Sequence, residues 1–272
     1  MQKSEAIKLI IIGGGEDKKT DKEILKEVVR LSGGKDSRIA VITTATNFPL
    51  EVGDEYKRLF YDLGVDKVDT VNIVDRKEAN RKQITRGLED ITCIFFVGGD
   101  QLRISSILGG TDFHRSIIKQ MERGAIIAGT SAGASMMSEI MMVQGEEEDA
   151  PRKCTINMAS GMGLLKGTII DQHFNQRGRI GRLLGAVAQN PYVLGIGIDE
   201  DTAIVVDHQD TIRVVGSGVV TIVDGREIDY TNISEQYPDE PLALTNVKIH
   251  ILPHSYGFDL INRKAVLKEG NE

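Results

Sequence analysis

The sequence predicts an α/β fold: a mostly parallel central sheet flanked by helices, followed by a β-rich C-terminal part. Short apolar runs alternate with amphipathic stretches from residue 6 to residue 143, which is typical of βαβ units. From residue 193 onward, short β-rich runs separated by turns indicate antiparallel hairpins. Neither a linker nor a repeat interrupts the 272 residues, so we expect one α/β domain over residues 1–272.

The apolar runs of the first half predict five buried strands, at residues 6–12, 38–43, 68–74, 92–97 and 125–128. Helical periodicity separates and follows them, at residues 20–32, 52–63, 77–88, 104–108, 113–121 and 134–143. Gly33-Gly34 suits the end of the first helix and Gly64 that of the second. Strands joined through helices run parallel, with right-handed crossovers. Their carboxyl ends therefore meet at the edge where such sheets carry active sites.

The second half is less regular. Residues 145–149 are expected to form a solvated acidic loop, and the glycine-rich residues 158–167 an irregular segment. A short strand is predicted at residues 168–170, and a helix with one buried apolar face at residues 179–189. The later strands are expected at residues 193–198, 202–207, 211–215, 219–223, 247–252 and 256–261.

Composition excludes several classes of function. A net charge of −7 without a basic run argues against a nucleic-acid surface; it suits a cationic substrate, and solubility alone explains it equally well. Cys93 and Cys154 are too few for a disulfide framework, and neither the cysteines nor the scattered histidines have metal-ligand spacing, so we expect no metal or cofactor. No apolar run approaches the roughly 20 residues of a membrane span. The chain begins without a signal-peptide pattern, so we expect a cytoplasmic protein.

A candidate nucleophile follows the fifth strand. Gly129-Thr130-Ser131-Ala132-Gly133 is a G-x-S-x-G between an apolar run and a helical stretch, the context of a nucleophile elbow. Its small residues let the backbone bend sharply and lift the Ser131 hydroxyl clear of the sheet. The motif by itself fits a serine nucleophile and an ordinary βα turn about equally well.

Two further glycine-rich turns close predicted strands. Gly13-Gly14-Gly15 lacks both the Gly-Lys-Ser/Thr and the G-x-G-x-x-G spacing of phosphate-binding loops, so we interpret it as an ordinary βα turn. Gly98-Gly99, after the fourth strand, falls at the same sheet edge as Ser131. This coincidence favours an active site there.

A serine nucleophile needs a base, and His173 is the best candidate. His114, His208, His250 and His254 fit ordinary polar positions. His173 closes the strand at residues 168–170 and stands among polar residues, which are Asp171, Gln172, Asn175, Gln176, Arg177, Arg179 and Arg182. So polar a segment is costly to bury unless it lines a cleft, which favours a functional role over the alternative, a solvated helix start.

The carboxylate that orients the base is expected within Asp199-Glu200-Asp201, which lies between two predicted strands. The local pattern does not choose among the three acids. The order serine, histidine, acid differs from the order serine, acid, histidine of the α/β-hydrolases, so the elbow is similar to theirs in a different fold.

Four segments together resemble the cyanophycinases: residues 96–102, residues 128–134, residues 171–182 and residues 195–203. Cyanophycinases are serine exopeptidases, related to aspartyl dipeptidases, that cut the poly-aspartate backbone of cyanophycin (multi-L-arginyl-poly-L-aspartate) and release β-Asp-Arg. The resemblance implies this activity through an acyl-enzyme, a fold akin to class I glutamine amidotransferases, and a homodimer. It implies Ser131 as nucleophile, His173 as general base and then acid, and Glu200 as the orienting carboxylate.

The other site residues are expected around these three. Backbone N–H groups of Ala132 and of Gly99 or Asp100 are candidates for the oxyanion hole. Arg179 and Arg182 suit capture of a substrate carboxylate, whereas Arg177 fits that role and a capping or pairing role equally. Gln101 and Gln172 suit substrate amides, and Asp171 a substrate guanidinium.

Two other functions share some of these features. An aspartyl dipeptidase-like enzyme would act on Asp-X peptides with the same machinery. A non-catalytic, amidotransferase-like binding module would use Ser131 only as a turn residue. The arginines beside His173 and the late β-rich region favour the polymer-degrading enzyme.

Overall fold

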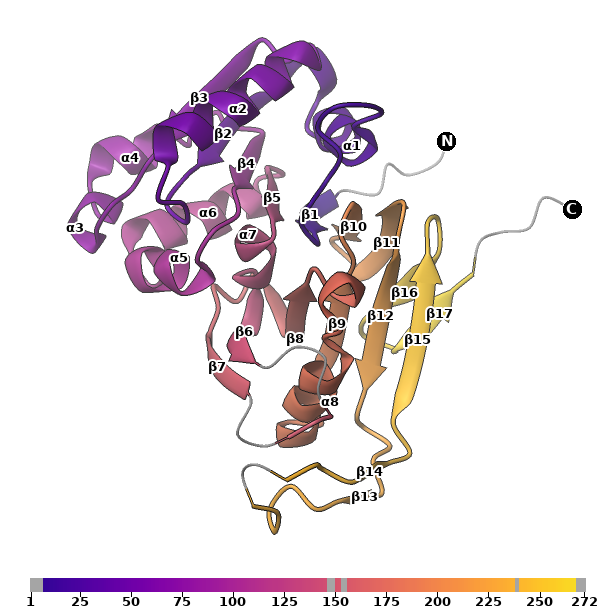
Figure 1. Ribbon diagram of the computed structural model, residues 1–272. Helices are drawn as coiled ribbons and strands as arrows, with labels where there is room; N and C mark the ends of the chain where they lie inside the picture. The colour runs from indigo at the N-terminus through magenta and orange to yellow at the C-terminus, as the bar shows by residue number, and fades with distance from the viewer. Residues whose placement is uncertain (1–6, 146–149, 153–155, 238–239, 268–272) are drawn as a thin grey trace, which may run out of the picture.

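The computed structural model describes residues 7–145, 150–152, 156–237 and 240–267, and within these ranges two large sheets carry the fold (Figure 1). The first sheet contains, in spatial order, β17 (Lys264–Val266), β16 (Gly257–Asp259), β11 (Thr211–Gly216), β10 (Thr202–Asp207), β1 (Ile7–Ile12), β5 (Ile126–Thr130), β4 (Cys93–Phe96), β2 (Arg38–Ile42) and β3 (Lys67–Val71). Cys154 and residues 146–149 of the predicted acidic loop lie outside the described residues.

Only half of the first sheet is parallel. The sequence predicts a mostly parallel sheet, and the pairings among β1, β5, β4, β2 and β3 are parallel. The pairings from β1 through β10, β11 and β16 to β17 are antiparallel. The later hairpin strands extend the sheet because β10 is buried along its whole length, so it fits beside β1 and not at an exposed edge.

The second sheet contains, in spatial order, β15 (Lys248–Pro253), β12 (Val219–Asp224), β9 (Leu194–Ile198), β8 (Leu165–Gln172), β6 (Ser138–Gly145) and β7 (Ile156–Ser160). β8 runs parallel to both of its neighbours, β6 and β9. Beyond the two sheets, β13 (Tyr230–Thr231) and β14 (Leu244–Thr245) form a small antiparallel pair.

Three sequence-based element predictions were wrong. Where a helix was predicted at residues 134–143, the structure has a short α7 (Ala132–Ser135) followed by β6. A short apolar run fits a buried helix and a buried strand equally well, and here the pairing with β7 and β8 makes it a strand. The predicted irregular segment 158–167 contributes to β7 and β8. The predicted helix 77–88 is divided into α3 (Arg76–Ala79) and α4 (Lys82–Arg86).

The remaining helices cover the sheets in layers. They are α1 (Glu23–Leu31), α2 (Pro49–Asp62), α5 (Gln101–Leu108), α6 (Asp112–Glu122) and α8 (Ile180–Gln189), with short 3₁₀ turns η1 (Gly34–Asp36) and η2 (Asn175–Arg177). Side chains alternate along β1, so Ile10 and Ile12 pack with α1 and α2, whereas Leu9 and Ile11 face the opposite layer.

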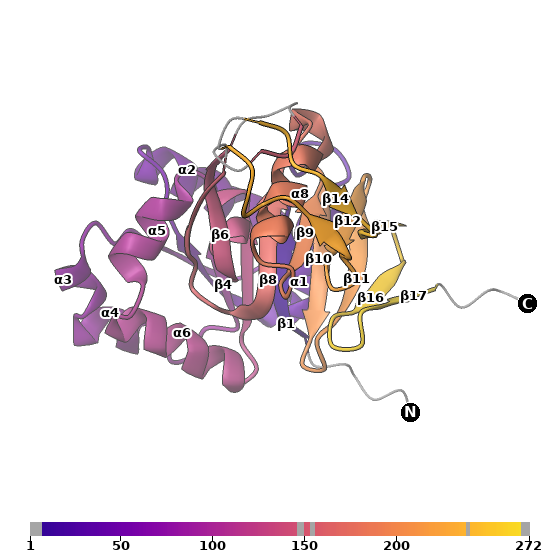
Figure 2. The ribbon, with the colours of Figure 1, turned by 90° about the horizontal axis from the view of Figure 1, so that it is seen from below.

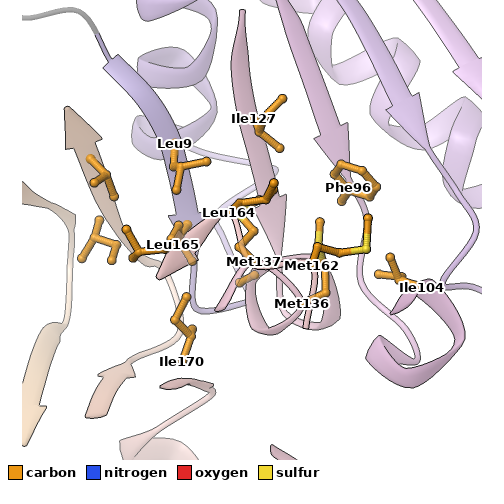
Figure 3. Packing of buried hydrophobic residues seen from close by; sticks show 14 of the residues in the cluster. Leu9, Phe96, Ile104, Ile127, Met136, Met137, Met162, Leu164, Leu165 and Ile170 are labelled. Atoms are coloured by element: carbon orange, nitrogen blue, oxygen red, sulfur yellow. The ribbon is translucent and has the colours of Figure 1, made fainter. Parts of the chain in front are cut away.

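That opposite layer joins the two sheets. α5, α6 and the inner face of the second sheet share one apolar cluster with the first sheet, and Figure 3 shows Leu9 and Ile127 from one sheet near Leu165 and Ile170 from the other. The outer face of the second sheet packs against α8 through Leu183. Viewed from below, α3 to α6 lie at one end of the molecule and β15 to β17 at the other (Figure 2). Among the described residues, none of the helices has the length and hydropathy needed to cross a membrane.

Candidate active site

Ser131 lies in a sharp turn between β5 and α7. Its backbone has φ 53° and ψ −111°, a conformation that L-residues rarely adopt and that marks the strained turn of a nucleophile elbow. The glycines of the motif are required by close packing, because a Cβ on Gly129 would lie 2.5 Å from the carbonyl oxygen of Gly133. A Cβ on Gly133 would lie 2.4 Å from that of Phe96.

Ser131, His173 and Glu200 form a hydrogen-bonded series. The Oγ of Ser131 lies 3.0 Å from Nε2 of His173, and Nδ1 of the same ring lies 2.6 Å from Oε1 of Glu200. An ionised carboxylate only accepts, so Nδ1 carries the proton and Nε2 is left to accept from the serine hydroxyl. The imidazole is 14% exposed and the carboxylate 40%, so the ring is shielded while its outer partner meets solvent.

Of the three neighbouring acids, only Glu200 faces His173. Asp199 accepts hydrogen bonds from the backbone and side-chain nitrogens of Asn175 and from the N–H of Val219. Asp201 accepts from the N–H of Asp17 and from the hydroxyl of Ser217. Those two carboxylates therefore fix loops, a distinction that the sequence pattern did not make.

The turn after β1 holds the three segments together, a role the sequence analysis missed. Successive carbonyl oxygens of Ile12, Gly13 and Gly14 accept the backbone N–H groups of Ser131 at 3.0 Å, of His173 at 2.8 Å and of Asp201 at 2.9 Å. The side chains pack there too: a Cβ on Gly15 would lie 2.9 Å from Oε2 of Glu200. The glycine run lies between β1 and α1, as expected of a βα turn. The sequence signal for its packing role is that three successive residues have no side chain.

Glu16 continues this turn as a buried carboxylate beneath the elbow. It accepts hydrogen bonds from the hydroxyl of Thr130, the residue before Ser131, at 2.6 Å, and from the phenol of Tyr56. Burial, together with the charge of Glu16, raises the pKa of Tyr56 well above its ordinary value. The phenol therefore stays protonated and donates a hydrogen bond to the carboxylate of Glu16. Glu16 thereby ties the glycine turn to β5.

Two of the three predicted oxyanion donors remain available. Within the described residues, neither the N–H of Gly99 nor that of Ala132 donates to another group, and Ala132 begins α7, where the first N–H groups have no intrahelical partner. The turn that carries Gly99 lies close to Ser131, since a Cβ on the preceding residue, Gly98, would lie 3.4 Å from the Cβ of Ser131. Asp100 was predicted as an alternative donor, but its N–H donates to the carbonyl oxygen of Ala45 at 3.0 Å.

Asp171, Arg179 and Arg182 are brought together as a buried ionic cluster. Arg182 binds both carboxylate oxygens of Asp171, one of them at 2.7 Å, and Arg179 donates to the backbone oxygen of Gln172 at 2.7 Å. Asp171 is 1% exposed and Arg182 8%. Asp171 was predicted to receive a substrate guanidinium; its oxygens are instead occupied by Arg182, out of contact with solvent.

The other predicted substrate-binding residues lie on separate elements. Gln101 starts α5 and donates from Nε2 to the backbone oxygen of Met142 at 2.9 Å. Gln172 ends β8, and its buried Oε1 accepts no hydrogen bond within the described residues. Arg177 is exposed on η2, four residues after His173.

The residues expected to be inert stand away from this site. His114 accepts the N–H of Gly110 at Nδ1 and lies 2.9 Å from the carbonyl oxygen of Met162 at Nε2. Cys93 is buried in β4, and burial raises its pKa to about 12. Over the described ranges, no group of His, Cys, Asp or Glu residues is arranged to hold a metal ion.

Comparisons with known proteins agree on one family. The model of peptidase family S51 matches residues 9–215. The chain is 40% identical over 258 residues to a cyanophycinase of Geminocystis herdmanii (strain PCC 6308), covering 94% of each chain. It is 39% identical over 260 residues to a cyanophycinase of Trichormus variabilis (strain ATCC 29413 / PCC 7937), covering 95% of this chain and 87% of the relative.

Solved structures show the same fold at lower identity. A peptidase from an acI-B1 actinobacterium superposes with a TM-score of 0.64 at 24% identity, covering 83% of this chain and 94% of the other.

Proposed function

The chain belongs to peptidase family S51, and from that premise we propose that it is a serine-type exopeptidase that hydrolyses the poly-aspartate backbone of cyanophycin to β-Asp-Arg dipeptides. The observation that carries the proposal is the series Ser131–His173–Glu200, with 3.0 Å and 2.6 Å between its partners. Serine, histidine and carboxylate in this arrangement are the parts that acyl transfer needs.

In the proposed reaction, the Ser131 oxygen attacks the scissile carbonyl carbon while its proton passes to Nε2 of His173. The tetrahedral intermediate collapses as the imidazolium gives that proton to the leaving amine, which breaks the peptide bond and leaves an acyl-enzyme. Water then repeats the cycle, releasing the acid and restoring the serine. Glu200 holds the ring in the required tautomer and stabilises the imidazolium throughout.

The N–H groups of Gly99 and Ala132 form the oxyanion hole in this proposal. Both belong to turns at the carboxyl ends of neighbouring strands, β4 and β5, and both are free to donate to an oxyanion. Loss of one such donor typically lowers kcat by about 10²–10³-fold.

The proposed substrate-binding residues are Gln101, Gln172, Arg177, Arg179 and Arg182. Arg177 is the exposed arginine of the three, and the orphaned Oε1 of Gln172 is a ready acceptor for a substrate N–H. The pairing of Arg179 and Arg182 with Asp171 supports a role in holding the segment that carries His173.

Four wider features belong to the same proposal. Residues 1–272 act as a single peptidase domain, which is supported by one apolar cluster that spans both sheets. This domain works in the cytoplasm. The parallel half of the first sheet, with the elbow after β5, supports kinship with class I glutamine amidotransferases. A homodimer forms through β15, which ends the second sheet and exposes 48% of Ile249 and 64% of Ile251.

The deciding experiment incubates the purified protein and its Ser131→Ala variant with insoluble cyanophycin and identifies soluble products by mass spectrometry. We expect β-Asp-Arg from the wild type alone. If Asp-X dipeptides are cleaved and the polymer is not, the dipeptidase function replaces this one. If neither is cleaved, the polymer assignment fails, and stoichiometric labelling of Ser131 by a serine-directed phosphonate would exclude the binding module.

A further inference from the structure

A pocket adjoins the oxyanion turn on the side of β2. It has a volume of about 350 Å³ and is lined by residues 45–48 after β2, by Gly99 and Asp100 after β4, and by Arg103 of α5. The N–H of Asp100 bonds the carbonyl oxygen of Ala45 at 3.0 Å, which joins the two walls. The pocket therefore lies beyond the carboxyl ends of adjacent parallel strands, next to the turn that carries Gly99.

Arg103 brings a positive charge to the pocket, and within the described residues its guanidinium forms no ion pair with a carboxylate, although Asp100 lines the same pocket. Its guanidinium donates to Oδ1 of Asn47 at 2.9 Å and to the backbone oxygen of Thr46 at 3.5 Å, and both acceptors are neutral. The side chain is only half-exposed, and within the described residues it takes part in no ion pair. Arg182, by contrast, is already bound to Asp171. Arg103 is thus poised to bind an external carboxylate.

Phe48 and Asp100, which also line the pocket, suit a cationic, planar group. Phe48 is 65% exposed although it lines the pocket, so its ring is available for stacking. Guanidinium groups stack on aromatic faces. Asp100 adds negative charge to the pocket lining, and one of its carboxylate oxygens caps α5 by accepting from the N–H groups of Leu102 at 2.8 Å and of Arg103 at 3.2 Å. A carboxylate receptor and a guanidinium receptor therefore face one space.

We infer that this pocket is a subsite for one arginyl group of the substrate, with Arg103 binding its α-carboxylate and Phe48 stacking on its guanidinium. The inference rests on the proposed function, because the arginyl groups of cyanophycin carry both charges on one flexible chain. The subsite would place an arginyl group beside the oxyanion turn while the poly-aspartate backbone crosses Ser131.

The test measures binding of two ligands by isothermal titration calorimetry: β-Asp-Arg, and β-Asp-agmatine, which lacks only the α-carboxylate of the arginyl group. We expect the wild type to bind β-Asp-Arg roughly 10- to 100-fold more tightly, the range of a charged hydrogen bond. Arg103→Gln should abolish that preference, and Arg103→Lys, which keeps the charge, should retain part of it. Phe48→Ala should weaken both ligands equally.

The matched control is Arg123→Gln, which removes an exposed arginine before the amino end of β5, at the far edge of the sheet. It should keep the full preference for β-Asp-Arg. A preference that survives Arg103→Gln, or no binding of β-Asp-Arg to the wild type, would overturn the subsite. Failure of the proposed function would be seen in a different experiment: the wild type would release no β-Asp-Arg from the polymer, whatever the result of the binding measurement.

Discussion

Gly14 lies flat against the imidazole of His173. A Cβ at this glycine would stand 2.4 Å from Cε1 and 2.5 Å from Nε2, the atom that faces Ser131. The backbone of Gly14 has φ +96°, and its carbonyl oxygen binds the N–H of Asp201, so the turn has little freedom to withdraw. The imidazole of His173 can therefore occupy its position only because residue 14 has no Cβ.

Gly14→Ala should lower kcat for β-Asp-Arg release by about 100-fold or more, because a displacement of roughly 1 Å at the reacting atoms costs about that much. The control is Gly64→Ala, at φ +86° with no atom within 4 Å of the added Cβ. Both variants bear the strain of a left-handed alanine, roughly 1–2 kcal/mol, and only the first displaces His173. Equal kcat values for the two would disprove the positioning role.

Asp171→Asn should destabilise the protein by about 3–5 kcal/mol, because it breaks the buried ion pair between Asp171 and Arg182. Urea unfolding measures the difference. Asp90→Asn serves as the control, since Asp90 is 82% exposed and its pair with Arg38 contributes about 0–1 kcal/mol. If Asp171 instead received the substrate guanidinium, its variant would raise KM and leave the unfolding free energy unchanged.

His114 should make stability sensitive to mild acid. Burial lowers its pKa, and protonation would remove the acceptor that holds the N–H of Gly110. A histidine with a lowered folded-state pKa stabilises above its unfolded pKa of about 6.5, and that contribution is lost as pH falls through the folded value. Between pH 7.5 and pH 5, we expect a smaller fall in unfolding free energy for His114→Gln than for the wild type. Parallel pH profiles would contradict this account.

Cys93 should resist thiol reagents in the folded protein. Burial raises its pKa to about 12, so almost no thiolate exists at neutral pH, and its sulfur has no contact with solvent. Labelling with iodoacetamide, followed by mass spectrometry of the peptide that contains Cys93, should detect modification only after denaturation. Rapid labelling of this peptide under native conditions would show that β4 is more accessible than the structure indicates.

Ile251→Lys should shift the protein towards the monomer in sedimentation velocity. The substitution puts a charge on the outward face of β15, where it would be desolvated in the proposed homodimer. His250→Gln is the comparison, because His250 lies on the inward side of the same strand against Phe258, with 5.1 Å between the ring centroids. An unchanged sedimentation coefficient for Ile251→Lys would exclude β15 as the dimer interface.

Regular elements of the first half were predictable because their signals are local. Short apolar runs predict β1, β2, β4 and β5 close to their observed bounds. The strand β6 was not predictable, because its apolar residues fit a helix or a strand and only the pairing with β7 and β8 decides between them. The second sheet as a whole depends on such long-range pairings, so no window of sequence describes it.

The candidate site divides in the same way. Ser131 and His173 carry local signals, a tight turn and a polar strand end. The choice of Glu200 came from family resemblance, because its two neighbours are also acids and only the folded turn separates their directions. Gly14 and Arg103 were missed: Gly14 matters because it lacks a side chain, and Arg103 because the two acceptors of its guanidinium are neutral.

The position of β1 also bears on when the protein becomes active during its synthesis. Ile12 pairs with Ala203, so the strand made first gains its second neighbour only after some 190 residues more have been translated. At roughly 5–20 residues per second, a nascent chain on the ribosome therefore spends on the order of 10–40 s without β10. Through all of that time Glu200 is also missing, so the hydrogen-bonded series Ser131–His173–Glu200 cannot form until the chain has been translated past residue 200.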